Sequence, residues 1–218
     1  MMVKAIVFDL DGTLLDTLAD LTTSVNWALQ RNGLPTREAR EVRRFLGNGV
    51  GRLMECAVEG GASNPLLVPA FADFKAHYVE HCLDETRPYP GVSEMLEELA
   101  HRGYRLAIVS NKLQAGVTEL HQRFFSTTVQ VAIGEHEGVR RKPAPDMVNA
   151  ALAQLGVTAD EAVYVGDSEV DLATARASGL PCISVLWGFR DREDLVAAGA
   201  QTIIASPDAL VSEVLAMI

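Results

Sequence analysis

Two aspartates that follow a short apolar run have a spacing that could do chemistry. The run Val3–Phe8 contains β-branched and aromatic side chains, which is typical of a buried strand in a parallel sheet. Asp9 and Asp11 stand at its C-terminal end, and Gly12 follows them. Two carboxylates about 4 Å apart, at an effective dielectric constant near 20, repel each other by roughly 4 kcal/mol. The pattern therefore predicts a cation or a shared proton between them.

Other polar side chains follow further apolar runs. Ser110 and Asn111 follow the second expected strand, Lys142 lies in the connection after the third, and Asp167 and Asp171 follow the fourth. Ligands of open parallel sheets bind beyond the carboxyl ends of the strands, so we expect these groups to meet. Carboxylates suit magnesium, whereas a hydroxyl, an amide and an ammonium suit phosphate oxygens. The sequence therefore predicts a magnesium site beside a phosphate site.

The elements that must position these groups alternate along the chain. After the first strand, short apolar runs predict strands at 105–109, 129–133, 162–165, 182–186 and 202–204. Helical patterns at 91–102, 145–155 and 207–217 lie among these strands, with proline or glycine at their ends. This order predicts an α/β fold with a doubly wound parallel sheet.

One interval breaks the alternation. Residues 17–87 contain no convincing strand, but show successive helical patterns at 18–30, 37–45, 49–58 and 65–83. So long a helical interval is unusual for one strand-to-strand connection. We expect a helical cap domain at 17–87, inserted into a core formed by 1–16 and 88–218. The alternative is a set of extra helices packed on the sheet edge.

Composition narrows the classes of partner. The chain has 218 residues, a hydrophobic content of 48% and a formal net charge of -10. An acidic chain argues against nucleic acid or an anionic membrane surface as a partner. Its three cysteines form no C-x-x-C motif and suit a reducing compartment, so we expect a cytoplasmic protein. A monomer and a homodimer both remain open.

Four segments resemble the motifs of the haloacid dehalogenase superfamily of phosphotransferases. They are residues 9–16, 110–112, 142–143 and 166–171, and they occur in the family's order. The resemblance covers essentially the whole chain, and the helical interval is similar to the family's first type of cap. It implies a Rossmann-like core, a phosphorylated small-molecule substrate and Mg²⁺ as cofactor.

The resemblance also implies roles for the first two aspartates. Asp9 corresponds to the nucleophile that becomes an aspartyl phosphate, which splits one displacement into two easier ones. Asp11 corresponds to the acid that protonates the leaving oxygen and later deprotonates water. Dehalogenating relatives lack this second aspartate, so carbon–halogen chemistry is not expected.

The remaining motif residues correspond to binding groups. By resemblance, Mg²⁺ is held by the Asp9 carboxylate, the Asp11 backbone carbonyl and Asp167, with Asp171 acting directly or through another ligand. Ser110 and Lys142 correspond to phosphate-binding groups. Asn111 is a weaker phosphate-binding assignment that could instead orient its loop.

Simpler roles are open for several of these residues. Ser110 could cap a helix, and Lys142 belongs to a basic run at 140–142 of the kind that is usually solvated. Ser168 and Asp171 have capping-box spacing, so Asp171 could serve a helix N-terminus as well as the site. Asp9 and Asp11 could merely cap the turn that follows them.

Substrate choice is expected to depend on the cap. Residues 47–54 resemble a cap loop of the phosphoglycolate phosphatase subgroup, in which Asn48 lies between two glycines. Arg52 could pair with a substrate carboxylate because a guanidinium matches a carboxylate in a fork. The alternatives are an ordinary surface arginine and a related enzyme acting on sugar phosphates or pyrophosphate.

The sequence also contains a pattern that points to another functional class. His77, Glu80 and His81 match the H-x-x-E-H pattern of zinc peptidases. The competing interpretation is a cap helix with an apolar stripe that the histidines flank, and no other motif supports peptidase chemistry. A third hypothesis is a binding module that keeps the fold without turnover.

Overall fold

The computed structural model describes residues 3–217 and divides them into two compact units. One unit comprises the chain up to Leu14 and again from Pro88 onward, and the other is Leu15–Arg87. The sequence predicts this first boundary after Asp16, two residues further along the chain.

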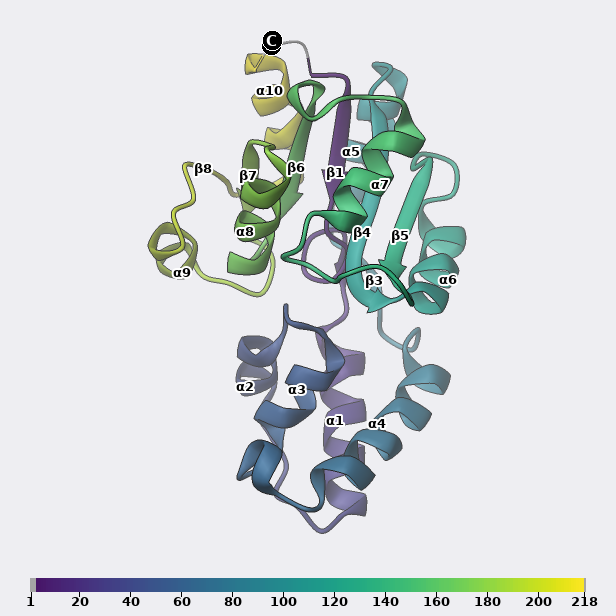
Figure 1. Ribbon diagram of the computed structural model, residues 1–218, viewed down its shortest axis with the longest axis vertical. Helices are drawn as coiled ribbons and strands as arrows, with labels where there is room; N and C mark the ends of the chain where they lie inside the picture. Colours follow the sequence, from purple (N-terminus) through teal and green to yellow (C-terminus); the bar gives the residue numbers. More distant parts are fainter. Residues whose placement is uncertain (1–2, 218) are drawn as a thin grey trace. The chain divides into compact units, whose positions relative to one another are not determined.

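The first unit is built on a six-stranded sheet (Figure 1). Its strand order is β5-β4-β1-β6-β7-β8, and all the strand pairs are parallel. The bounds are β1 Ala5–Phe8, β4 Arg105–Leu113, β5 Val131–Glu135, β6 Ala162–Gly166, β7 Cys182–Val185 and β8 Thr202–Ile204. The strand order reverses direction between β1 and β6, so their carboxyl ends flank a topological switch point. The predicted α/β fold is confirmed.

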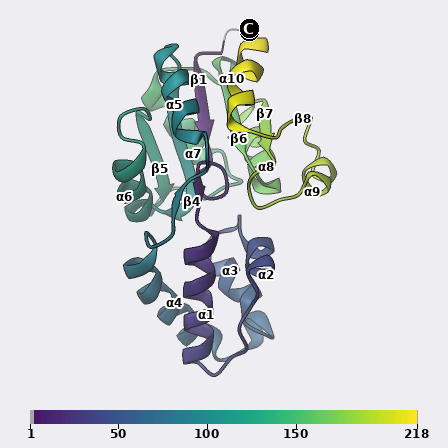
Figure 2. The same cartoon turned by 180° about the vertical axis from the view of Figure 1, so that it is seen from behind.

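Helices cover both faces of this sheet. Ala5 and Val7 of β1 share a hydrophobic core with α7 (Asp146–Leu155), and α8 (Glu169–Ser178) packs beside α7. Figure 1 shows α7 and α8 in front of the sheet, and Figure 2 shows α5 (Val92–His101) and α10 (Pro207–Ala216) on the opposite face. Helix α6 (Gln114–Phe124) packs on β5, and α9 (Arg192–Ala197) precedes β8.

Strands β4 and β5 end two or more residues beyond their predicted ends. The third strand begins at Val131, two residues later than expected, and β4 continues to Leu113 instead of ending at Val109. The pairing of β4 with β5 shifts register between Val109 and Leu113. An irregular extension of this kind redirects side chains near the end of a strand, and it cannot be recognised from an apolar run alone.

The second unit is helical. It contains α1 (Leu18–Arg31), α2 (Ala39–Phe45), α3 (Gly49–Ala57), the short 3-10 helix η1 (Gly61–Ser63) and α4 (Leu67–His81). Leu53, Met54 and Phe74 are fully buried, so the expected amphipathic helices have a core of their own. The two-residue strands β2 (Leu15–Asp16) and β3 (Arg87–Pro88) pair with each other. The chain therefore enters and leaves this unit side by side.

A buried carboxylate links residues near the start and the end of the helical unit. Asp20, in the first turn of α1, is 3% exposed. Its two carboxylate oxygens accept hydrogen bonds from the backbone N–H groups of Glu85 and Thr86 at 2.8–3.1 Å. The carboxylate thus joins the start of the unit to its end.

Within residues 3–217, none of the helices has both the length and the apolar character needed to cross a bilayer.

Candidate active site

Asp9 follows the end of the central strand. Its backbone N–H donates to the carbonyl of Val165 on β6 at 2.9 Å, which continues the sheet by one residue. The side chain is buried, and its Oδ1 accepts from the backbone N–H of Leu10 at 2.7 Å. The Lys142 ammonium lies 2.7 Å from the same oxygen. The Asp9 carboxylate is therefore held from both sides at the end of β1.

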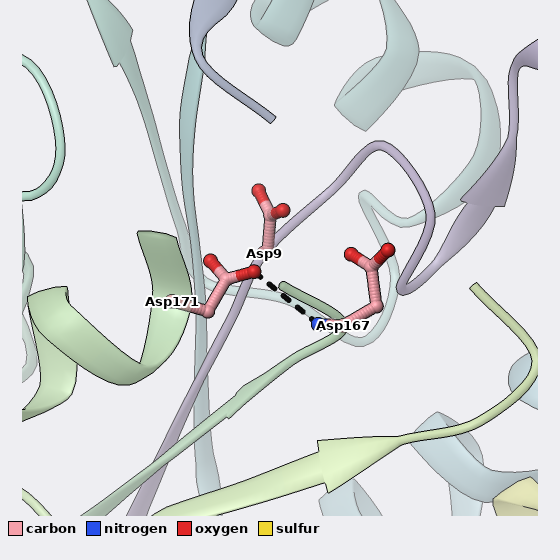
Figure 3. A group of neighbouring side chains, drawn as sticks. All are labelled: Asp9, Asp167 and Asp171. Carbon is pink, nitrogen blue, oxygen red and sulfur yellow. Dashed lines mark hydrogen bonds between the residues drawn. The ribbon is translucent and has the colours of Figure 1, made fainter. Parts of the chain in front are cut away.

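Three aspartates meet at this edge (Figure 3). Asp9, Asp167 and Asp171 offer oxygens that all lie within 4.8 Å of one another, and all three residues are buried. Among the described residues, this is the one cluster of three or more histidines, cysteines or acids that could hold a metal ion. Carboxylate oxygens are hard ligands, so they bind Mg²⁺ more favourably than they bind softer metal ions. The donor set therefore fits a divalent cation.

Asp167 is held at both of its oxygens. The Thr13 hydroxyl donates to Oδ1 at 3.2 Å, and the Phe189 backbone N–H donates to Oδ2 at 2.6 Å. Burial and then the charge of Asp171 raise the pKa of Asp167 from 3.8 to about 7. Burial, followed by Asp171, also raises the pKa of Asp9 well above its usual range. A divalent cation at this point would oppose both shifts, because it stabilises the ionised carboxylates.

Asp171 organises the neighbouring groups. Its Oδ1 accepts from the Lys142 ammonium at 2.9 Å and the Tyr164 hydroxyl at 3.0 Å. Its Oδ2 accepts from the backbone N–H groups of Asp167 and Ser168 at 3.2 and 3.1 Å, and from the Ser168 hydroxyl at 2.6 Å. The predicted capping box is present at the start of α8, because the Ser168 hydroxyl also accepts from the Asp171 N–H. Asp171 therefore caps the helix and orients the site at the same time.

Lys142 is a buried cation with three partners, although its sequence context is that of a solvated run. Its ammonium contacts Asp9, Asp171 and the Tyr164 hydroxyl at 2.7, 2.9 and 3.1 Å, and the residue is 3% exposed. Burial alone would lower the pKa of Lys142, but Asp171 and Asp9 outweigh it and raise the pKa overall. The side chain thus remains charged and partly neutralises the acids around it.

Asn111 supports the backbone of Lys142. Its Oδ1 accepts from the Lys142 N–H at 2.8 Å, and its Nδ2 donates to the Lys142 carbonyl at 3.1 Å. Two bonds to one residue fix the loop that carries the ammonium. This geometry favours the loop-orienting role over direct phosphate binding for the Asn111 side chain.

The irregular end of β4 carries Lys112, which forms an ion pair with Asp11. Lys112 lies in this segment, and its ammonium donates to Asp11 Oδ1 at 3.0 Å. The Lys112 backbone N–H donates to the Ser110 hydroxyl oxygen at 3.2 Å, and Ser110 is buried. Ser110 therefore lies within β4 and caps no helix at this position.

The two residues that the sequence suggests for substrate selection belong to the helical unit. Asn48 and Arg52 lie at the start of α3 in the helical unit, and the exposed Arg52 guanidinium bonds to Glu55 at 2.7 Å. The pattern His77, Glu80 and His81 lies on and at the end of α4, and it is not among the clusters of three potential ligands in the described chain. His77 and His81 stack with ring centroids 4.2 Å apart, as packed aromatic rings do.

Sequence reasoning missed four contributions to the site. They are the Thr13 hydroxyl, the Tyr164 hydroxyl, the pairing of Lys112 with Asp11, and the Phe189 N–H. Tyr164 carries a usable signal, because it is the one polar-tipped side chain in an otherwise apolar strand. The Phe189 contact involves backbone alone and leaves no trace in residue type.

The raised pKa of Asp167 predicts a pH-dependent stability. The folded, metal-free protein retains a proton at Asp167 that the unfolded chain loses above pH 4, so this residue's contribution falls between about pH 4 and pH 7. Asp167→Asn stays neutral, and its amide can satisfy both Thr13 and Phe189. We expect its stability advantage over wild type to grow across that window, to on the order of 2–4 kcal/mol. Thermal unfolding in chelator from pH 4.5 to 8 measures this, and parallel curves for the two proteins would contradict it.

Comparisons with known proteins agree with this geometry. The family of haloacid dehalogenase-like hydrolases matches residues 6–185. A phosphoglycolate phosphatase of Rhodospirillum rubrum is 34% identical over 210 residues, covering 93% of this chain and 87% of that protein. An N-acetylmuramic acid 6-phosphate phosphatase of Pseudomonas aeruginosa is 30% identical over 213 residues, covering 97% and 94%.

A solved structure extends the agreement to the whole fold. A candidate phosphoglycolate phosphatase from Lactobacillus delbrueckii subsp. bulgaricus superposes with a TM-score of 0.94 at 34% identity, covering 98% of this chain and 99% of that one. The ordered motifs, the sheet topology and the aspartate cluster agree with the family match. This chain belongs to the haloacid dehalogenase-like hydrolases.

Proposed function

We propose that this protein is a Mg²⁺-dependent phosphomonoesterase whose preferred substrate is phosphoglycolate. The observation that carries the proposal is the position of the Lys142 ammonium, which contacts Asp9 and Asp171 beside the third acid, Asp167. An anionic nucleophile and an anionic phosphate repel each other until positive charge is supplied. Lys142 supplies one such charge, and Mg²⁺ held by Asp9, Asp167 and the Asp11 carbonyl would supply two more.

The reaction proceeds in two displacements. Asp9 attacks phosphorus, the bond to the ester oxygen breaks, and Asp11 gives its proton to that oxygen. The aspartyl phosphate is then attacked by water, whose proton passes to Asp11 as the Asp9–phosphorus bond breaks. Lys142 and Ser110 hold the transferring oxygens, while Asn111 fixes the Lys142 backbone. Positioning and charge compensation provide most of the rate enhancement.

The choice of phosphoglycolate rests on two supports. The relative from R. rubrum is named a phosphoglycolate phosphatase, and this chain spans most of its length. The start of α3 also presents Arg52 after the Gly-Asn-Gly segment, where an exposed guanidinium can exchange Glu55 for a substrate carboxylate. The P. aeruginosa relative favours a second candidate, a phosphorylated amino sugar acid.

A substrate panel tests the proposal. Phosphoglycolate, N-acetylmuramic acid 6-phosphate, glucose 6-phosphate, pyrophosphate and p-nitrophenyl phosphate are compared with Mg²⁺ and with EDTA. We expect the highest kcat/KM for phosphoglycolate and loss of turnover in EDTA. A preference for the amino sugar acid would support the second candidate. Absence of turnover on every phosphate would exclude a phosphatase, and zinc-dependent peptide cleavage would restore the peptidase hypothesis.

Arg52→Ala is predicted to weaken the binding of phosphoglycolate, which carries a carboxylate, but not that of a phosphoester without one. Loss of a charge-assisted contact of about 1.4 kcal/mol raises KM for phosphoglycolate about tenfold, while KM for p-nitrophenyl phosphate stays within twofold. Arg40→Ala is the matched control, because Arg40 is also an exposed arginine paired with a glutamate in the helical unit. Equal changes for both substrates, or in both variants, would remove Arg52 from substrate selection.

A further inference from the structure

We propose that Trp187–Arg190, the segment that follows β7, holds Asp167 in its metal-facing orientation and ties it to the loop after Asp9. The inference rests on the metal site of the proposed function, and it assigns a positioning role to residues outside the motifs. Three kinds of contact carry it: hydrogen bonds, close backbone packing and an ion pair.

Hydrogen bonds connect both carboxylate oxygens of Asp167 to the segment 187–190, one directly and one through Thr13. Oδ2 accepts from the Phe189 N–H at 2.6 Å, and Oδ1 accepts from the Thr13 hydroxyl at 3.2 Å. The Trp187 indole N–H donates to the Thr13 carbonyl at 2.9 Å. Segment 187–190 therefore contacts Asp167 directly and also holds the residue that contacts its other oxygen. Rotation of the Asp167 carboxylate would break bonds on both sides.

The segment also packs against the site without an intervening side chain. A Cβ on Gly188 would lie under 3.0 Å from Asp167 Cβ, Asp167 Oδ2 and the Gly12 carbonyl oxygen. Gly12 has a φ of +90°, and a Cβ there would lie 2.6 Å from Asp167 Oδ2 and 2.7 Å from the Phe189 ring. Two glycines on separate loops thus allow Asp167 to lie between them, in a space that a methyl group on either would fill.

An ion pair between the buried Arg190 and the exposed Glu169 anchors the far end of the segment. Arg190 is 9% exposed, and its guanidinium donates to both carboxylate oxygens of Glu169 at 2.7 and 2.9 Å. Glu169 begins α8, two residues after Asp167. A forked pair of this kind has one preferred geometry. The segment is therefore fixed to the loop after β1 at Trp187 and to the start of α8 at Arg190.

This arrangement assigns the segment a role in metal affinity. Alteration of a group that orients a metal ligand typically lowers metal affinity or activity 10- to 100-fold. The Phe189 N–H is such a group, and Trp187 and Gly188 determine where it lies. A role confined to folding would instead change thermal stability and leave the affinity for Mg²⁺ unaltered.

Trp187→Phe tests the proposal by removing the indole donor while keeping an aromatic ring. Trp27→Phe is the matched control, since Trp27 lies on α1 in the helical unit and its ring contacts the His77 ring at a centroid distance of 4.7 Å. Isothermal titration of Mg²⁺ alone into each full-length protein gives the dissociation constant without turnover. We expect Trp187→Phe to weaken Mg²⁺ binding about three- to tenfold, as the loss of one hydrogen bond does. Trp27→Phe should stay within twofold of wild type.

Gly188→Ala provides a second, steric test. Its methyl group displaces Asp167, so we expect Mg²⁺ binding to weaken by more than about tenfold. Circular dichroism confirms the fold, and the tryptophan variant decides the question if this one is insoluble. Equal Mg²⁺ affinities for Trp187→Phe and wild type would overturn the positioning role alone. A wild type that binds no Mg²⁺ would overturn the metal site of the proposed function and this inference with it.

Discussion

Asp9→Asn is expected to lower kcat for p-nitrophenyl phosphate by at least about 10⁴-fold, because loss of a covalent nucleophile is among the most costly changes in an active site. The amide has no anionic oxygen with which to form a bond to phosphorus. Its carbonyl can still accept from the Leu10 N–H and from Lys142, so the local geometry is kept. Burial already raises the pKa of Asp9, so a neutral side chain should not lower the Tm.

The measurement pairs steady-state kinetics with mass spectrometry of acid-quenched protein. Wild type should show a phosphorylated peptide that contains Asp9, and the variant should show none. Asp160→Asn is the matched control, because Asp160 is an exposed aspartate of the same unit and undergoes the same chemical change. Turnover in Asp9→Asn within tenfold of wild type would mean that another group, or water itself, attacks phosphorus.

Lys142→Met should lower kcat/KM by about 10³-fold, near the upper range for loss of one group that stabilises a transition state. The side chain keeps its approximate length, but Asp9 and Asp171 lose their shared cation. Lys142 lowers the pKa of Asp9 through its charge and its hydrogen bond, so removing it raises that pKa further. The ionised nucleophile then appears only at higher pH, and the acid limb of the pH–rate profile moves upward.

A profile of kcat/KM from pH 5 to pH 9 measures both the loss and the shift. Lys142→Arg is the control, because it keeps the charge while changing its shape. We expect it to keep the wild-type acid limb and to recover part of the rate. Thermal unfolding accompanies the kinetics, since breaking a buried ion pair costs about 3–5 kcal/mol when one partner remains charged. A methionine variant with the wild-type profile would show that Lys142 does not act on Asp9.

The strands and the convergence of the site could be predicted because both depend on local pattern. Short apolar runs identify buried parallel strands, and the carboxyl ends of such strands share one edge. Asp9 and Asp167 follow two of these runs, Asp171 lies four residues after Asp167, and their carboxylate oxygens lie within 4.8 Å of one another. The residue type and neighbours of Lys142 do not predict its burial, because a basic run is usually solvated. Lys142 could be identified because residues 142–143 stand third among the four family motifs.

The contacts that the sequence did not predict depend on the folded backbone. The extension of β4 to Leu113 is an irregularity of pairing with β5, and it decides where Lys112 meets Asp11. The Phe189 N–H acts on Asp167 through the main chain, which any residue but proline possesses. The space at Gly188 is likewise a property of two loops that are far apart in sequence. Such features follow from tertiary structure and have no period or motif of their own.

The paired ends of the helical unit have an evolutionary consequence. Because β2 and β3 lie side by side and Asp20 fastens the first turn of α1 to residues 85–86, the unit closes on itself at its root. A segment with adjacent ends can be exchanged as a cassette without rebuilding the scaffold that receives it. The helical unit can therefore be replaced as one piece, while the side chains at the strand ends of the other unit keep their positions.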